Sequence, residues 1–204
     1  MTMGGAARHN VANALAAMLA AEALDIPLES IGDTLRRFGG DPGDNPGRAN
    51  FFEVGGAKVV IDYAHNPDGM RALAAATDGI PARRRLVLLG QAGDRTDAAI
   101  RDLARAAMAL RPDRVVAKEM DRYLRGRVPG EVPGLIADEF RRLGLGADQV
   151  TCGGVEVEAA REALGWARPG DLLVFALHQD REAVVALLDR LRETGWRAGE
   201  PLSG

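Results

Sequence analysis

The feature that most constrains the fold of this chain is a repeated alternation of short apolar runs with helix-type patterns from residue 58 onward. The apolar runs, such as Leu-Val-Leu-Leu at 86–89, are continuous, which is typical of strands buried on both faces of a sheet. Expected strands cover 58–62, 85–89, 114–118, 149–152 and 171–177, and expected helices cover 67–77, 95–110, 131–143, 155–167 and 180–193. This alternation predicts a parallel sheet with helices on both faces.

A hairpin adds a sixth strand to the expected sheet. Residues 51–54 and 58–62 flank Gly55 and Gly56, a pair that suits a tight turn between antiparallel strands. We therefore predict an α/β fold with a Rossmann-like, mostly parallel six-stranded sheet, helices on both faces and one antiparallel edge strand.

The first forty residues have a different pattern. Residues 9–24 and 28–38 are rich in Ala and Leu and predict a helical pair that precedes the sheet. Residues 39–47 are dominated by Gly, Pro and Asn, which marks a linker or a domain boundary. The predicted organisation is a helical unit at 1–40, a linker at 41–49 and the α/β domain at 50–204.

Composition argues against several classes of protein. Acidic residues number 29 and basic residues 26, so the chain lacks the overall charge of a nucleic-acid or membrane-surface protein. The longest apolar stretch, 11–24, is too short and too polar for a bilayer span, and the start of the chain has no signal-peptide pattern. The single cysteine, Cys152, excludes an internal disulfide. We expect a cytoplasmic protein, and the sequence leaves its oligomeric state open, a homo-oligomer included.

Four polar loops follow the expected strands, at 62–68, 90–95, 118–127 and 178–180. Open α/β sheets bind ligands beyond the carboxyl ends of their strands, so these loops form the predicted binding edge. Each loop alone is more typical of an ordinary connection with a helix cap. Four such loops at one edge favour a ligand site.

The loop at 62–68 has the features of an anion site. Asn66 can cap the next helix, and Pro67 suits its first position. Free backbone N–H groups and the positive end of the helix dipole would then lie near Asp62 and His65. The Asp62 carboxylate suits a donor such as a ribose hydroxyl. The alternative is that Asp62 and His65 only brace the turn.

The loop after the second parallel strand carries a weaker signal. Gly90 and Gly93 would let a ligand approach the backbone, with Arg95 free to neutralise a carboxylate or phosphate. Their spacing matches neither the dinucleotide-binding fingerprint nor a P-loop.

The last two loops are open to two interpretations each. Arg122, Arg125 and Arg127 suit bidentate binding of a carboxylate or phosphate, although nearby acidic residues make a solvated surface an equal alternative. His178 either faces a ligand or is satisfied within the fold. The three histidines lack metal-ligand spacing, so no metal site is predicted in this chain.

Together these motifs resemble the Mur ligase superfamily. Residues 62–67, Asp-Tyr-Ala-His-Asn-Pro, are similar to the signature that opens its C-terminal domain, and residues 8–17 resemble the helix that ends its central ATPase domain. Pro-Gly-Arg at 46–48, Gly-Asp-Arg at 93–95 and the run 124–131 follow in the expected order. Within the superfamily, residues 4–10 and 124–131 look most like the cyanophycin synthetases.

The resemblance implies an ATP-dependent amide ligase, in which a carboxylate becomes an acyl phosphate and an amino group then displaces phosphate. The residues that it places near ATP are Asn10, Asn13, Arg48, Asp62, His65 and Asn66. Those that it places near the incoming amino acid are Arg95, Arg125, Arg127 and His178. In a cyanophycin synthetase that amino acid is arginine, added to an aspartate side chain of the polymer. A peptidoglycan or folate type of ligase is the alternative within the superfamily.

The resemblance also implies that much of the ATP site lies elsewhere. The P-loop, the Mg²⁺ ligands and the activating lysine of these ligases belong to the central domain, and the 204 residues contain no P-loop. We therefore expect residues 1–40 to be the end of a truncated ATPase domain, and the chain alone to be inactive. The alternative from another class is a free-standing, non-catalytic Rossmann-like module that binds a nucleotide or a protein.

Overall fold

The computed structural model describes residues 8–38 and 45–202. In order, its elements are α1 (Arg8–Glu22), α2 (Leu28–Arg37), β1 (Asn50–Val54), β2 (Ala57–Asp62), α3 (Pro67–Thr77), β3 (Arg85–Leu89), α4 (Asp97–Ala107), η2 (Met108–Leu110), β4 (Arg114–Ala117), η3 (Asp121–Tyr123), α5 (Glu131–Arg142), η4 (Ala147–Gln149), β5 (Val150–Cys152), α6 (Glu156–Trp166), β6 (Leu172–Ala176) and α7 (Arg181–Glu193). Each predicted strand and helix is present, with small differences at its ends.

The strands form one six-stranded sheet in the order β1-β2-β6-β3-β4-β5. The edge strand β1 pairs antiparallel with β2, with Phe52 opposite Val59, and the other pairs are parallel. The predicted mixed sheet with one antiparallel edge strand is therefore confirmed. Because β6 is inserted between β2 and β3, the carboxyl ends of β2, β6, β3 and β4 are neighbours.

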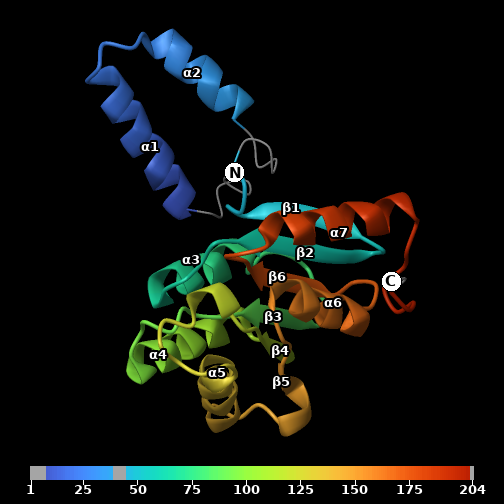
Figure 1. Cartoon of the computed structure of the whole chain (residues 1–204). Helices are drawn as coiled ribbons and strands as arrows, with labels where there is room; N and C mark the ends of the chain where they lie inside the picture. Colours follow the sequence, from blue (N-terminus) through green and yellow to red (C-terminus); the bar gives the residue numbers. More distant parts are fainter. Residues whose placement is uncertain (1–7, 39–44, 203–204) are drawn as a thin grey trace.

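Helices cover both faces of the sheet, with α3, α4 and α5 on one face and α6 and α7 on the other (Figure 1). Alternate residues of each strand face opposite layers. Val60 and Val174 join the cluster under α3–α5, whereas Val59 and Leu173 join the cluster under α6 and α7. The strands are apolar at successive positions because both faces are covered.

Local sequence signals determine where α3 begins and where the chain turns between β1 and β2. The Asn66 Oδ1 accepts a hydrogen bond from the N–H of Gly69 at 2.7 Å, and Pro67 is the first residue of α3, as predicted. At the far end of β2, Gly55 and Gly56 form the hairpin turn with φ of 60° and 81°, a left-handed conformation that favours glycine.

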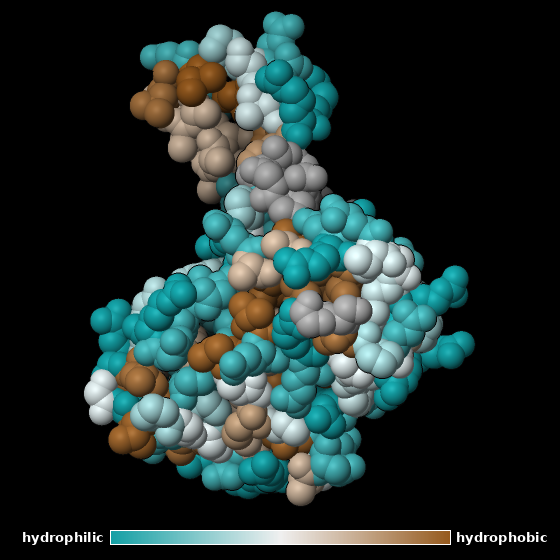
Figure 2. Space-filling view, turned by 45° about the vertical axis from the view of Figure 1, so that its right-hand side comes forward, coloured by the Kyte–Doolittle hydropathy of each residue, from teal (hydrophilic) through white to brown (hydrophobic). Residues whose placement is uncertain are grey.

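The helical pair lies apart from the sheet (Figure 1). Ile31 on α2 is buried, but Leu15 and Leu19 on α1 are 55% and 67% exposed, and Leu24 in the turn is 75% exposed. Hydrophobic surface is accordingly visible on the pair in Figure 2. None of the described helices is long and apolar enough to cross a membrane.

The predicted boundary lies partly outside the described residues. Residues 1–7 and 39–40 of the helical unit, 41–44 of the linker and 203–204 of the α/β domain are not among them. The division into 1–40, 41–49 and 50–204 therefore stays a prediction.

Candidate functional site

The four polar loops meet at the carboxyl edge of the sheet, as predicted. The side-chain amide of Gln91, after β3, donates to the carbonyl of His65, after β2, at 2.9 Å. The N–H of Gly93, after β3, donates to the carbonyl of Tyr123, after β4, at 2.8 Å. Arg122, after β4, donates to the carboxylate of Asp180, after β6, at 2.8 Å. These contacts join the four loops into one polar surface.

A cleft of about 890 Å³ opens between the helical pair and the loop after β2. Its volume lies in the range of small-molecule sites, roughly 300–1,000 Å³. Residues of both units line it, and they include all six that the family resemblance places near ATP: Asn10, Asn13, Arg48, Asp62, His65 and Asn66.

Asp62 and Arg48 are linked through the segment before β1. Asp62 ends β2, is 8% exposed, and accepts the N–H of Ala49 through Oδ2 at 2.9 Å. The neighbouring Arg48 side chain is exposed, and its guanidinium carbon lies 5.1 Å from the ring centroid of Tyr63, a cation–π contact. Asp62 thus braces the segment that presents Arg48 to the cleft. A contact of Asp62 with ribose stays a prediction.

The other four cleft residues come from both walls. His65 is exposed, with Nδ1 3.1 Å from the carbonyl of Tyr63, and Asn66 uses its Oδ1 as the α3 cap. Across the cleft, Asn10 is buried on α1 and Asn13, about one turn later, is exposed. The structure brings these residues together, and their contacts with a nucleotide stay predictions.

The glycines after β3 serve the fold, which corrects the expectation that they let a ligand approach. A Cβ on Gly93 would lie 2.0 Å from the carbonyl oxygen of Leu124, and a Cβ on Gly90 would lie 2.8 Å from the side chain of Lys118. The loop after β4 therefore occupies the space that these glycines leave. Arg95 is exposed and lies 3.9 Å from the carboxylate of Asp94.

Two of the three arginines after β4 are engaged by acidic partners. The Arg127 side chain is only 16% exposed and pairs with Asp97 at 2.8 Å and with Glu131 at 2.5 Å. Arg122 pairs with Asp180 of the loop after β6 at 2.8 Å. These contacts hold the loop in place, and a substrate contact of Arg127 stays a prediction.

Arg125 differs from its neighbours. Within the described part of the chain its guanidinium has no acidic partner, and it lies 5.3 Å from the ring centroid of Tyr123. Its backbone has φ of 49°, in the left-handed region that is uncommon for a long side chain. This loop therefore holds an exposed cation in a strained conformation, a feature that clusters at ligand sites.

His178 is satisfied within the fold, which is one of its two predicted interpretations. Nδ1 lies 3.1 Å from the Lys118 Nζ, and Nε2 lies 3.3 Å from the carbonyl oxygen of Ala64. Since an ammonium only donates, Nδ1 is the acceptor and Nε2 carries the proton. Burial and the nearby Lys118 charge lower the pKa of His178 to about 3, so the ring is neutral at physiological pH. A contact with substrate stays a prediction.

Sequence reasoning missed the partner of Lys118. This side chain is 0% exposed and forms a salt bridge with Glu156, which is 1% exposed at the start of α6. Burial opposes ionisation of Glu156, but the Lys118 charge and hydrogen bond and the backbone N–H groups of His178 and Asp180 outweigh it, so its pKa is lowered. Burial lowers the pKa of the Lys118 ammonium, and Glu156 offsets part of this effect.

The described residues do not form a metal centre. No three His, Cys, Asp or Glu side chains gather in a way that would hold a cation. A Mg²⁺ ion that accompanies ATP is therefore not assigned to ligands in this part of the chain.

Comparison with known proteins identifies the family. The sequence profile described as "Mur ligase, glutamate ligase domain" matches residues 47–176. The chain belongs to the Mur ligase family. The match covers the strands β1–β6 and the loops after β2, β3 and β4, and it ends at the last residue of β6.

Relatives of this Mur ligase domain include a cyanophycin synthetase and a 2,6-diaminopimelate ligase. It is 40% identical over 138 residues to a cyanophycin synthetase of Crocosphaera subtropica, covering 68% of this chain and 16% of that protein. It is 34% identical over 177 residues to a UDP-N-acetylmuramoyl-L-alanyl-D-glutamate--2,6-diaminopimelate ligase of Gloeobacter violaceus, covering 83% of this chain and 33% of that protein. The chain thus spans one third or less of these two relatives.

Solved structures show the same fold. MurF from Acinetobacter baumannii matches 91% of this chain and 38% of its own, with a TM-score of 0.58 and 23% identity. A pseudomurein peptide ligase type C from Methanothermus fervidus matches 87% of this chain and 35% of its own, with a TM-score of 0.59 and 18% identity. These matches include residues before 47, because residues 47–204 make up only about 77% of the chain.

Proposed function

We propose that this chain acts as the C-terminal part of an ATP-dependent ligase that joins a carboxylate to an amino group through an acyl phosphate. A carboxylate oxygen attacks the γ-phosphorus of ATP, and ADP leaves. The amino nitrogen then attacks the acyl carbon, the phosphate leaves, and the nitrogen loses a proton. Such catalysis depends on positioning and on neutralisation of charge, which this domain would supply from one side of a closed site.

The cleft between the helical pair and the loop after β2 carries the proposal. It gathers residues from segments that are far apart in the sequence, and it combines an exposed guanidinium, Arg48, with the aromatic ring of Tyr63. A guanidinium suits a phosphate, and the N-terminus of α3 adds backbone N–H groups beside it. We assign ATP to this cleft, with its Mg²⁺ held by groups outside the described residues.

The incoming amino acid is assigned to the loop after β4. Arg125 is exposed, has no acidic partner in the described chain, and can offer a planar fork to a carboxylate. The higher identity to a cyanophycin synthetase than to the diaminopimelate ligase favours arginine as this amino acid. Its acceptor would then be an aspartate side chain of a growing polymer.

The exposed apolar surface of the helical pair supports the proposed domain division. Leu15 and Leu19 are one turn apart on α1 and more than half exposed. Exposed apolar patches on a soluble protein commonly mark an interface. We assign this surface to a central ATPase domain outside the 204 residues, without which the chain is inactive as a ligase.

The test is reconstitution of ligation. The coding sequence upstream of residue 1 is determined, and the complete protein is incubated with ATP, Mg²⁺, arginine and an aspartate-rich polymer primer. We expect ADP release that requires the amino acid, and formation of an amide product. The 204-residue chain, tested in parallel, should release no ADP and should bind ATP far more weakly than the complete protein.

Two results would contradict the proposal. Tight binding of ATP to the 204-residue chain would place a phosphate cradle within these residues. Binding of a nucleotide by the complete protein without amino-acid-dependent ADP release would favour a non-catalytic binding module.

A further inference from the structure

A charged pair is buried where the four loops meet. Lys118 directly follows β4, and Glu156 is the first residue of α6. Their side chains are 0% and 1% exposed. Burial of two charges costs several kcal/mol per ion, and the fold compensates only where each charge is fully hydrogen-bonded. The contacts of this pair therefore show what it holds in place.

Glu156 holds the loop after β6. Its carboxylate accepts the backbone N–H groups of His178, Gln179 and Asp180 at 2.7, 2.8 and 2.5 Å, in addition to the Lys118 ammonium. Three consecutive N–H groups bound to one carboxylate restrain the backbone of the loop at 178–180.

The same loop holds the segment assigned to the amino acid. The Gln179 side chain donates to the carboxylate of Asp121 at 2.8 Å, and Arg122 donates to Asp180 at 2.8 Å. Asp121 and Arg122 begin the turn that presents Arg125. The Glu156 carboxylate therefore sets the position of the amino-acid loop through two successive contacts.

Lys118 is also linked to the wall of the cleft, through His178. It donates to Nδ1 of His178, whose Nε2 in turn donates to the carbonyl of Ala64 at 3.3 Å. The His178 ring also packs edge-on against Tyr63, with ring centroids 5.0 Å apart. Tyr63 and Ala64 both line the cleft.

We propose that Lys118 and Glu156 are positioning residues that fix the amino-acid loop and the wall of the ATP cleft relative to each other. Neither side chain touches a substrate in this arrangement. The proposal rests on the proposed function for the identity of the two ligands, but the contacts that couple the loops do not depend on it.

The test uses neutral variants of similar volume in the complete ligase: Lys118→Met, Glu156→Gln and the double variant. Either single change leaves one buried group without its charged partner and should destabilise the fold. The double variant removes both charges and should recover most of the thermal stability. Its KM for the amino acid and its KM for ATP should nevertheless stay raised about fivefold or more, a coupling of ordinary size.

Lys58→Met is the matched control. Lys58 is the other lysine of the chain, lies at the opposite end of β2, and donates to the carbonyl of Pro81 at 3.0 Å. The KM values of the Lys58→Met variant for the amino acid and for ATP should equal those of the wild type. A double variant with wild-type KM values, or with only kcat reduced, would show that the pair merely fills the core and would overturn the proposal.

Hydrogen exchange in the 204-residue chain separates this inference from the proposed function. If the complete wild-type protein shows no ATP-dependent ligation, the proposed function fails, and the coupling is judged by exchange alone. The double variant should speed amide exchange in 62–66 and 119–127, with α4 unchanged and with no effect of Lys58→Met. Unchanged exchange in both loops would overturn the inference.

Discussion

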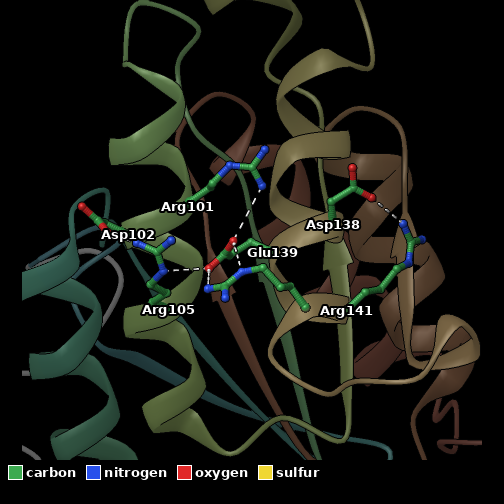
Figure 3. A network of polar contacts seen from close by, with 7 residues as sticks. Arg101, Asp102, Arg105, Asp138, Glu139 and Arg141 are labelled. Atoms are coloured by element: carbon green, nitrogen blue, oxygen red, sulfur yellow. Dashed lines mark hydrogen bonds and ion pairs between the residues drawn. The ribbon is translucent and has the colours of Figure 1, made fainter.

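Glu139→Gln tests the largest ionic cluster of the described chain, which joins α4 to α5. The Glu139 side chain is 1% exposed and lies among Arg101 and Arg105 of α4 and Arg142 of α5 (Figure 3). Arg142 donates to both carboxylate oxygens, at 2.6 and 3.0 Å, and Arg105 donates at 2.7 Å. The substitution keeps the shape of the side chain and removes its charge.

The magnitude follows from the pKa of the carboxyl group. Hydrogen bonds from Arg142 lower this pKa most, burial opposes them, and Arg105 lowers it further, so that it falls from 4.5 to about 2. A shift of this size corresponds to about 3.4 kcal/mol at most, at 1.36 kcal/mol per pKa unit. The arginine side chains are 33–60% exposed, and solvent screens their charges. We therefore expect a loss of about 2 kcal/mol at pH 7.

The pH dependence has a defined sign. Because the folded-state pKa of Glu139 is lower than the unfolded-state value, the unfolded chain binds more protons between them, and stability falls as the pH falls. The contribution is complete above about pH 4.5 and disappears toward about pH 2. The Glu139→Gln variant should lack this part of the acid sensitivity.

Urea denaturation followed by circular dichroism, from pH 7 to pH 3, measures both effects. Asp138→Asn is the matched control, because Asp138 is adjacent to Glu139, is 67% exposed and, among the residues that the structure describes, pairs with Arg141 alone, at 3.1 Å. An exposed pair contributes roughly 0.2–1 kcal/mol. A Glu139→Gln variant as stable as Asp138→Asn at pH 7, with the same slope in acid, would refute the argument.

Three further predictions concern the loops and the site. Gly93→Ala should lower the free energy of unfolding by about 1–3 kcal/mol, because the new Cβ would collide with the carbonyl oxygen of Leu124. Gly134→Ala, on α5 where a Cβ meets no other atom, should raise the free energy of unfolding by up to about 1 kcal/mol. Urea denaturation measures both changes. In the complete ligase, Arg48→Ala should raise the KM for ATP at least about tenfold, as loss of a charged ligand contact costs about 2–5 kcal/mol, and an unchanged KM would remove Arg48 from the site. Arg125→Lys should raise the KM for the amino acid about tenfold and leave that for ATP unchanged, because an ammonium cannot reproduce a bidentate contact. Arg192→Lys, at an exposed side chain of α7, is the control for all kinetic assays.

The strands and helices were predictable because the pattern of each element reports its own burial. Continuous apolar runs gave the two-sided burial of β2, β3 and β6 directly. The expected helix at 95–110 is instead α4 followed by the 3-10 turn η2. It starts later because Thr96 is its cap, with Oγ1 accepting the N–H of Ala99 at 3.2 Å. A helix cap depends on a single residue, so its signal in a sequence is weaker than that of a repeated apolar pattern.

The site was predictable only as far as strand ends reveal it. The carboxyl edge and its loops follow from the order of strands and helices, whereas Asn10, Asn13 and Arg48 of the cleft were predicted from the family resemblance alone. The state of each arginine does not, since Arg127 finds Asp97 thirty positions away and Arg125 finds no acidic partner in the described chain. Pairing between loops depends on how the strands are ordered in space, and β6 enters between β2 and β3 only in the folded sheet.

The lysine content of the chain did contain a signal for the buried pair. Of the 26 basic residues only Lys58 and Lys118 are lysines, and the others are arginines. The site at 118 offers two acceptors to the side-chain nitrogen, the Glu156 carboxylate and Nδ1 of His178. A guanidinium has five N–H donors in a planar fork and would leave several of them unpaired in a fully buried position, whereas a compact ammonium fits. In a chain that uses arginine almost everywhere else, a lysine that directly follows a buried strand therefore indicates a site where arginine cannot be accommodated.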